Sequence, residues 1–187
     1  MNIRLCLRSA VVTAFLLLAL PTQAAIIVTA IESDGNVIFS TDGGTLDLTG
    51  LRFDINDTIV AGIAPTGGSV VFGGAVDRYT GVTFTSFGPG TGSIETADSD
   101  PLAGFGFGRE QLAVPTGFLS GDTINATSIT FTGETFASLG ITAGNYTVAS
   151  WAGDSITLNA TAVPVPAAVW LFGSALGMLG WMRRKRA

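Results

Sequence analysis

The sequence predicts an all-β protein: an antiparallel β-sandwich, jelly-roll-like or immunoglobulin-like, with an N-terminal signal helix and a C-terminal single transmembrane helix. Three observations predict it. Between residues 25 and 162, apolar and polar residues alternate with a period of two, as in half-buried strands. Glycines and Asp-Gly pairs separate these runs at short intervals, as turns do. The 3.6-residue periodicity of amphipathic helices is almost absent.

The first element is a signal peptide over residues 1–24. Two arginines precede an apolar run at residues 10–20, and a proline follows that run. Thr22 and Ala24 are small residues at the −3 and −1 positions of a cleavage site, so we expect cleavage between Ala24 and Ala25. The alternative is an N-terminal anchor that stays uncut. Either form takes the rest of the chain out of the cytoplasm.

The exported body, residues 25–162, contains the predicted strands. The alternating runs are NVIFST (36–41), GTLDLTGLRF (44–53), GVTFTSF (81–87), TSITFTG (127–133) and SITLNATAV (155–163). In the last run Ile156 and Leu158 lie on one face and Thr157 on the other. Residues 134–141 break the alternation and predict one helical turn. Residues 88–104 are rich in glycine and predict a long surface loop.

The body is strongly acidic. All 14 acidic residues lie in it, against three cations, Arg52, Arg78 and Arg109, so its net charge is −11. The other six cations lie in the two terminal segments. A domain with this charge repels nucleic acid and anionic lipid, so we expect no nucleic-acid partner.

The residue inventory of the body excludes most catalytic mechanisms. The body has no His, Cys or Lys, which removes Ser-His and Cys-His nucleophile pairs, Schiff-base chemistry and imidazole or thiolate metal sites. A pair of carboxylates could still hydrolyse glycosides. However, no acid lies inside a plainly apolar strand where burial would raise its pKa. We therefore expect no enzyme and assign no catalytic residue.

Two kinds of binding site remain open in the body. Asp34 and Asp42, and likewise Asp98 and Asp100, lie near turns and could supply oxygen ligands to Ca²⁺. The alternative is that they are solvated loop acids, and no other cofactor is expected. Three aromatic residues could form a sugar-stacking surface: Trp151, Tyr79 and Tyr146. For Trp151 a place in the core is the favoured interpretation.

The tail, residues 163–187, predicts a short transmembrane helix over 167–182. As a helix these 16 residues span about 24 Å, against about 30 Å for a bilayer core. The helix is followed by a basic stop signal, Arg183, Arg184, Lys185 and Arg186, which stays in the cytoplasm. Three glycines share one helical face and would allow another helix to pack closely: Gly173, Gly177 and Gly180.

The segment VPVPAAVWLFGSALGMLGWMRRKR (163–186) resembles the PEP-CTERM sorting domain of Gram-negative bacteria. Its sorting motif corresponds to Val163, Pro164, Val165, Pro166 and Ala167. Val165 stands where the motif that names the family has Glu. The resemblance implies processing by exosortase, a multi-pass membrane enzyme, and an association with exopolysaccharide and biofilm. The body is similar to an uncharacterised group of such exported proteins, and this similarity implies no activity.

Together these features predict a non-enzymatic exported protein of the cell envelope or extracellular matrix, which passes once through the inner membrane and is sorted by an exosortase-type system. Its expected partners are that enzyme, the membrane through the C-terminal helix, and extracellular polysaccharide. The first alternative is a membrane-anchored periplasmic domain that binds a glycan or Ca²⁺. The second is an enzyme that acts on polysaccharide.

Overall fold

The computed structural model describes residues 25–162 and Ser174, and in this part the protein is all-β. The strands are β1 (Ile26–Ser33), β2 (Asn36–Thr41), β3 (Gly44–Thr45), β4 (Arg52–Ile59), β5 (Gly62–Ala64), β6 (Ser69–Val71), β7 (Gly74–Thr80), β8 (Thr83–Phe84), β9 (Glu95–Thr96), β10 (Gly106–Gly108), β11 (Gln111–Pro115), β12 (Thr123–Ile124), β13 (Thr127–Thr132), β14 (Gly144–Ser150) and β15 (Ser155–Ala162). The helical elements are η1 (Pro65–Gly67) and α2 (Phe136–Leu139).

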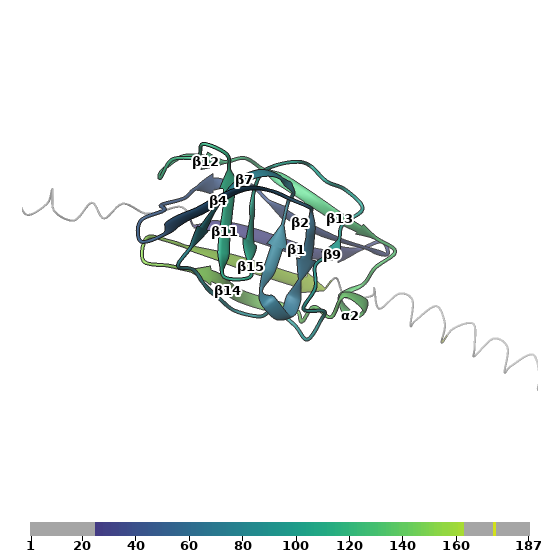
Figure 1. Ribbon diagram of the computed structural model, residues 1–187. Coiled ribbons are helices and arrows are strands. Elements are labelled where there is room, and N and C mark those ends of the chain that lie inside the picture. Colours follow the sequence, from purple (N-terminus) through teal and green to yellow (C-terminus); the bar gives the residue numbers. More distant parts are fainter. Residues whose placement is uncertain (1–24, 163–173, 175–187) are drawn as a thin grey trace, which may run out of the picture.

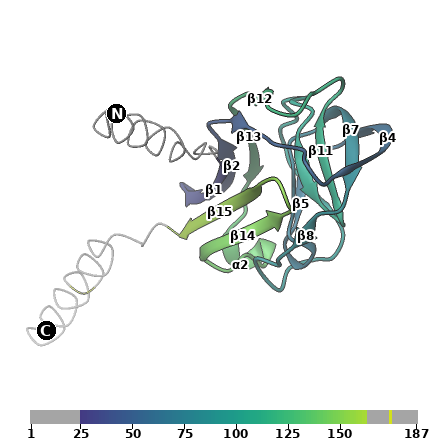
Figure 2. The same ribbon diagram turned by 90° about the vertical axis from the view of Figure 1, so that its left-hand side faces the viewer.

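Two large sheets form the two layers of the body (Figures 1 and 2). The six-stranded sheet has the order β13-β2-β1-β15-β14-β8, and the seven-stranded sheet has the order β4-β7-β11-β10-β6-β5-β9. β12 and β3 form a separate two-stranded sheet. In Figure 1 the seven-stranded sheet faces the viewer, and in Figure 2 it lies on the right.

One hydrophobic cluster joins the two large sheets. It contains alternate residues of the six-stranded sheet, such as Val28 and Leu158, and of the seven-stranded sheet, such as Leu112 and Val114. Aromatic rings fill its centre, and Phe72 stacks on Phe105 with 5.8 Å between the ring centroids. The period-two alternation in the sequence is therefore the pattern of side chains that point into this shared core.

The first and last strands run parallel, whereas the sequence predicted antiparallel pairing. β1 pairs with β15 from Ile26↔Ile156 to Glu32↔Ala162, and every other strand pair of the described residues is antiparallel. Parallel neighbours cannot be joined by a tight turn, and here the whole body lies between them. As a result, the chain enters and leaves the sheet at opposite ends of this pair.

Two of the predicted segments differ from the structure. In the run 44–53, only Gly44–Thr45 and the start of β4 are strand, because side chains rather than a neighbouring strand bind part of its backbone. The Leu48 N–H donates to Ser120 Oγ at 2.9 Å, and the Thr49 N–H donates to Asp47 Oδ1 at 2.8 Å. The predicted loop 88–104 contains β9, which pairs with β5.

The predicted helical turn is confirmed. α2 lies within 134–141 and begins with a capping box, in which Thr135 accepts from the Ser138 N–H and the Ser138 side chain accepts from the Thr135 N–H. It ends at Gly140, whose φ of 66° is the left-handed conformation that glycine adopts at helix ends.

The predicted signal peptide, sorting motif, packing glycines and basic cluster lie outside the described residues, as does the predicted transmembrane helix apart from Ser174. Of the two residues at the expected cleavage site, Ala25 belongs to the described part. Within that part, no helix has the length and apolar character needed to cross a membrane.

Candidate ligand-binding site

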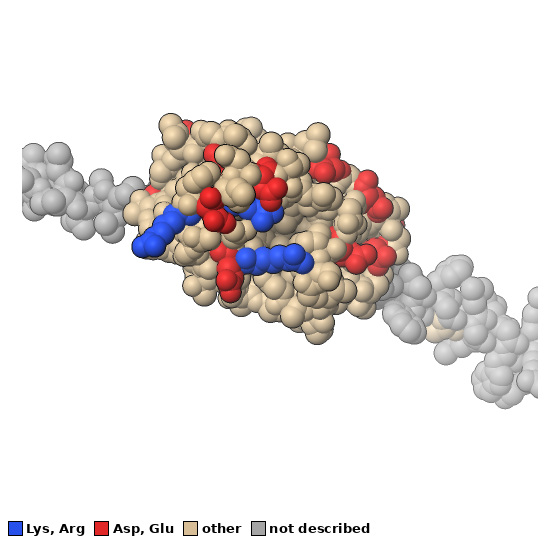
Figure 3. Space-filling model, in the orientation of Figure 1, with Lys and Arg blue, Asp and Glu red and all other residues tan. Residues whose placement is uncertain are grey.

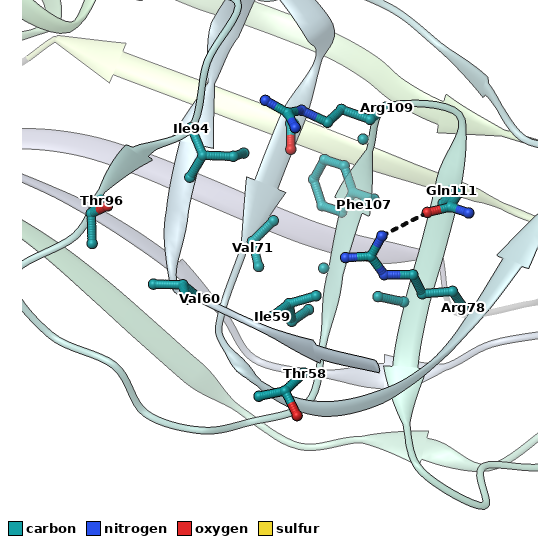
Figure 4. A pocket seen from close by; sticks show the side chains of 14 residues that line it. Thr58, Ile59, Val60, Val71, Arg78, Ile94, Thr96, Phe107, Arg109 and Gln111 are labelled. Atoms are coloured by element: carbon teal, nitrogen blue, oxygen red, sulfur yellow. Dashed lines mark hydrogen bonds between the residues drawn. The ribbon is translucent and has the colours of Figure 1, made fainter. Parts of the chain in front are cut away.

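A trough crosses the outer face of the seven-stranded sheet, on the side away from the shared core. Its volume is ≈ 350 Å³, within the range of small-molecule pockets. Its lining comes from six strands and the turns beside them: Thr58, Ile59, Val60, Ser69, Val71, Arg78, Ile94, Thr96, Gly106, Phe107, Gly108, Arg109, Gln111 and Ala113. Figure 4 shows these side chains around the hollow.

The trough is hollow because β10 presents no side chain to it. Phe107 points to the core and is 2% exposed, so the outward positions of this strand are Gly106 and Gly108. A Cβ at Gly108 would lie 2.2 Å from the Cβ of Ser69 on β6, and one at Gly106 would lie 3.0 Å from Val71 Cα. Only glycine therefore allows β6 and β10 to approach this closely.

The floor of the trough is apolar. Ile59, Val76 and Ala113 form a small hydrophobic cluster separate from the main core, and Val71 packs against it. These four residues come from four different strands, β4, β7, β11 and β6. Three of them, Ile59, Val71 and Ala113, line the trough and give it an apolar floor on which a ligand could lie, whereas Val76 is fully buried.

One side of the trough carries a fixed cation, Arg78. Its guanidinium forms an ion pair with Asp57 at 2.9 Å and donates to Gln111 Oε1 at 2.9 Å. Gln111 Nε2 in turn donates to Asp54 Oδ2 at 2.6 Å. This chain of contacts holds the Arg78 guanidinium and the Gln111 amide in place beside the apolar floor (Figure 4).

A second cation, Arg109, extends over the trough from the turn between β10 and β11 toward Ile94 (Figure 4). Arg109 and Glu110 are the two residues of this turn, and both have positive φ, 52° and 68°, as a type I′ hairpin requires. Among the described residues, Arg109 makes neither an ion pair nor a hydrogen bond, so its five donors are free for a ligand.

Two of the body's three cations thus lie at one trough in a domain with a net charge of −11. Figure 3 shows the corresponding face, with basic side chains near its centre and acidic ones around them. A carboxylate could bind Arg109 while an apolar group lies on the floor. The arrangement supports ligand binding, and sequence reasoning missed it because its residues come from distant strands.

The structure does not bring the four candidate Ca²⁺ ligands together. Asp34 precedes β2 and Asp42 follows it, so they lie at opposite ends of that strand. Asp98 Oδ2 accepts from the Thr132 N–H at 2.5 Å, and Asp100 Oδ1 accepts from the Leu102 N–H at 3.0 Å. In residues 25–162, no group of three or more acidic side chains could hold a metal ion.

The three aromatic candidates pack against the main core instead of forming one exposed surface. The Trp151 indole donates to the Asp47 carbonyl at 2.6 Å, and the Tyr146 hydroxyl donates to the Thr142 carbonyl at 3.0 Å. Tyr79 meets Phe53 edge to face at 5.8 Å. Burial, with a smaller effect of the nearby Asp77 charge, raises the pKa of Tyr79 above its ordinary value of 10.0.

One acid, which the sequence analysis did not single out, is buried in a strand of mixed composition. Asp77 on β7 is 8% exposed, and its carboxylate accepts hydrogen bonds from Asn56 Nδ2 and, at 2.9 Å, from the Gly117 N–H. These contacts tie the turn after β11 to the sheet. The run GAVDRYT gave no sign of this, because the partners of Asp77 are distant in sequence.

Comparison with protein-family models, with curated proteins and with solved structures finds no match for this chain.

Proposed function

We propose that the chain is a non-enzymatic exported protein of the cell envelope or extracellular matrix, sorted by an exosortase-type membrane enzyme. The observation that carries this proposal is the tail sequence, residues 163–186, with its prolines, short apolar segment and basic end. The limits of the folded body support it, because β15 ends at Ala162 and the motif begins at the next residue.

The finer architecture belongs to the same proposal. The body is a jelly-roll-like β-sandwich, the signal helix directs its export, and the tail helix crosses the inner membrane once. The shared core of the two large sheets supports the sandwich.

The intact mass of the mature protein tests the sorting proposal. We expect the chain recovered from a host that contains its exosortase to begin at Ala25 and to lack the basic tail. The same chain from a host without that enzyme should retain Ala187. A mature chain that ends at Ala187 in both hosts contradicts sorting and leaves the tail as a plain anchor.

The trough favours a second candidate function, a membrane-anchored periplasmic domain that binds a ligand. The specific observation is Arg109, a cation without a partner among the described residues, beside an apolar floor. Such a site suits a carboxylate that carries an apolar body.

Thermal denaturation of the full-length chain tests this second function. Octanoate should raise Tm, whereas octanol, which lacks the carboxylate, should not. Arg109→Gln should abolish the shift and Arg52→Gln should leave it unchanged, because Arg52 lies outside the trough lining. An equal shift in both variants contradicts a site at Arg109.

A further inference from the structure

Charge is distributed unequally between the two sheets. The strands of the seven-stranded sheet contain Arg52, Asp54, Asp57, Asp77, Arg78 and Glu95. The strands of the six-stranded sheet contain one charged residue, Glu32, whose carboxylate accepts from the Phe136 N–H at 2.6 Å. In a domain with a net charge of −11, the strands of this sheet therefore present no charged side chain on their outward face, and Asp42 lies beside that face, beyond the end of β2.

The outward positions of the six-stranded sheet carry hydroxyl and amide groups. Its inward positions, such as Val28, Phe39 and Leu158, lie in the core. The strand registers arrange most of the outward residues in four rows across the sheet: Thr83, Ser150 and Ser155; Thr147, Thr157 and Ile27; Asn145, Asn159, Thr29, Ser40 and Ser128; Thr161, Ile31, Ile38 and Thr130. We call these residues the hydroxyl face.

The hydroxyl face has a shallow relief and some apolar surface. A cavity of ≈ 200 Å³ lies beside Ile27, Thr29 and Ser40, with Asp42 at its rim beyond the end of β2. Ile27 and Ile31 are 50% and 38% exposed. Near the middle of the longest row, Asn159 Oδ1 is buried and has no hydrogen-bond partner among the described residues.

Charge decides which partners this face can take. The net charge of the body repels anionic polymers. A cationic partner would be attracted to the carboxylates, which lie in the loops and on the other sheet, apart from Glu32, which binds the Phe136 N–H. The partner that suits the hydroxyl face is therefore uncharged.

A second copy of the chain fits this face poorly. A stable dimer buries about 800 Å² on each partner, with an apolar centre. Here only three isoleucines interrupt the polar rows, so two stacked copies would bury many hydroxyl groups without assured hydrogen bonds. A hydroxylated polymer can instead exchange hydrogen bonds with each row, because Ser, Thr and Asn side chains all donate and accept.

We propose that the hydroxyl face binds an uncharged polysaccharide chain. Its hydroxyl groups exchange hydrogen bonds with the rows of Thr, Ser and Asn, and its C–H faces lie on the isoleucines. This inference names a ligand for the proposed matrix protein but rests on the sheet face alone. Its test does not depend on whether the tail is removed.

Sedimentation of the full-length chain in detergent with insoluble polysaccharides tests the proposal. The probes are cellulose, curdlan and chitin, which are uncharged, with calcium alginate gel as the acidic control. We expect the chain to sediment with at least one uncharged probe, equally at 50 mM and 500 mM NaCl, and to stay in solution with alginate. Salt independence is expected because no ion pair contributes.

Substitutions on the two faces locate the binding surface. Thr29→Asp places a charge in the longest row and should weaken binding at least tenfold. Thr29→Val, which keeps the shape and the strand propensity, should weaken it less. The matched control is Thr116→Asp, at an exposed residue of the turn after β11 in the other sheet and outside the trough lining, which should bind as the unmodified chain does. Circular dichroism establishes that each variant is folded.

Three results would each overturn the proposal. The first is that none of the three uncharged probes retains the chain. The second is that a folded Thr29→Asp variant binds as well as Thr116→Asp. The third is a dimer in size-exclusion chromatography that Thr29→Asp dissociates, since this would identify a second copy as the occupant of the face.

Discussion

At the scale of single residues, a few polar side chains hold together segments that are distant in sequence. Asp77 joins β4 and the turn after β11 to β7, and Trp151 binds the backbone of the segment that precedes β4. Local sequence patterns contain no sign of such contacts. Their roles were therefore beyond sequence reasoning, although the presence of Trp151 at the core was predicted correctly.

Asp77→Ala should destabilise the fold by about 1–3 kcal/mol, because it leaves Asn56 Nδ2 and the Gly117 N–H without their acceptor. Asp57→Ala is the control, since it removes a half-exposed ion pair worth about 0–1 kcal/mol. Urea denaturation of the full-length chain measures both. An equal decrease in the free energy of unfolding in the two variants would show that the buried carboxylate of Asp77 has no special role.

Tyr79 should make stability fall at alkaline pH. Burial raises its pKa in the folded state, so unfolding releases its proton more easily. The contribution of Tyr79 to the free energy of unfolding is complete below pH 10, the pKa of tyrosine in the unfolded chain. It is lost as pH rises through the higher pKa of the folded state. Tyr79→Phe should reduce this loss and should remove the later part of the phenol titration followed by ultraviolet absorbance. An unchanged titration contradicts the assignment.

At the scale of elements, period-two alternation predicted the strands with one polar face, such as β13 and β15. The alternation did not predict β1 as a strand, because Ile27 and Ile31 lie on its outward face and apolar residues therefore occur on both faces. β10 reads Gly-Phe-Gly, a composition that disfavours strands in isolation. The close approach of β6 requires glycine at positions 106 and 108. Because these glycines have no side chains, they also leave the hollow of the trough, which the sequence analysis missed.

Gly108→Ala tests how closely β10 approaches β6. The new Cβ would lie 2.2 Å from Ser69 Cβ, and residue 108 has a φ of 134°, which residues other than glycine rarely adopt. We therefore expect the free energy of unfolding to fall by about 2 kcal/mol or more. Gly92→Ala is the matched control, because nothing lies within 4 Å of its added Cβ. It should be neutral or slightly stabilising. Thermal denaturation that ranks the two variants equally would contradict this packing.

The sorting element should depend separately on its prolines and its cations. Replacing Pro164 and Pro166 by Ala should allow membrane insertion but block removal of the tail, since the chain at the membrane surface would no longer be held extended. Replacing the four basic residues, Arg183, Arg184, Lys185 and Arg186, by Ser should impair retention and processing together. Fractionation and intact mass distinguish these outcomes. Normal processing of the proline variant contradicts the proposed role of the motif.

At the scale of the whole molecule, the period-two alternation predicted the all-β class and the residue counts established the acidic body, and the described residues bear out the all-β class. The sequence did not give the arrangement of strands. β1 and β15 pair across more than a hundred intervening residues, and their parallel direction leaves no local trace in the sequence. The unequal distribution of charge between the two sheets also depends on this order, because the charged residues of each sheet could be counted only after its strands were known.

The parallel pairing of β1 and β15 also sets how the body resists mechanical force. When its two ends are pulled apart, the seven residue pairs of this ladder are sheared together rather than opened one after another. Force spectroscopy with cysteine handles at Ala25 and Ala162 should therefore record a higher unfolding force than handles at Ala25 and Asp42. The latter pair lies at the same end of the antiparallel β1–β2 hairpin and peels it apart. A body built this way transmits tension between its two ends without unravelling its outer strands first.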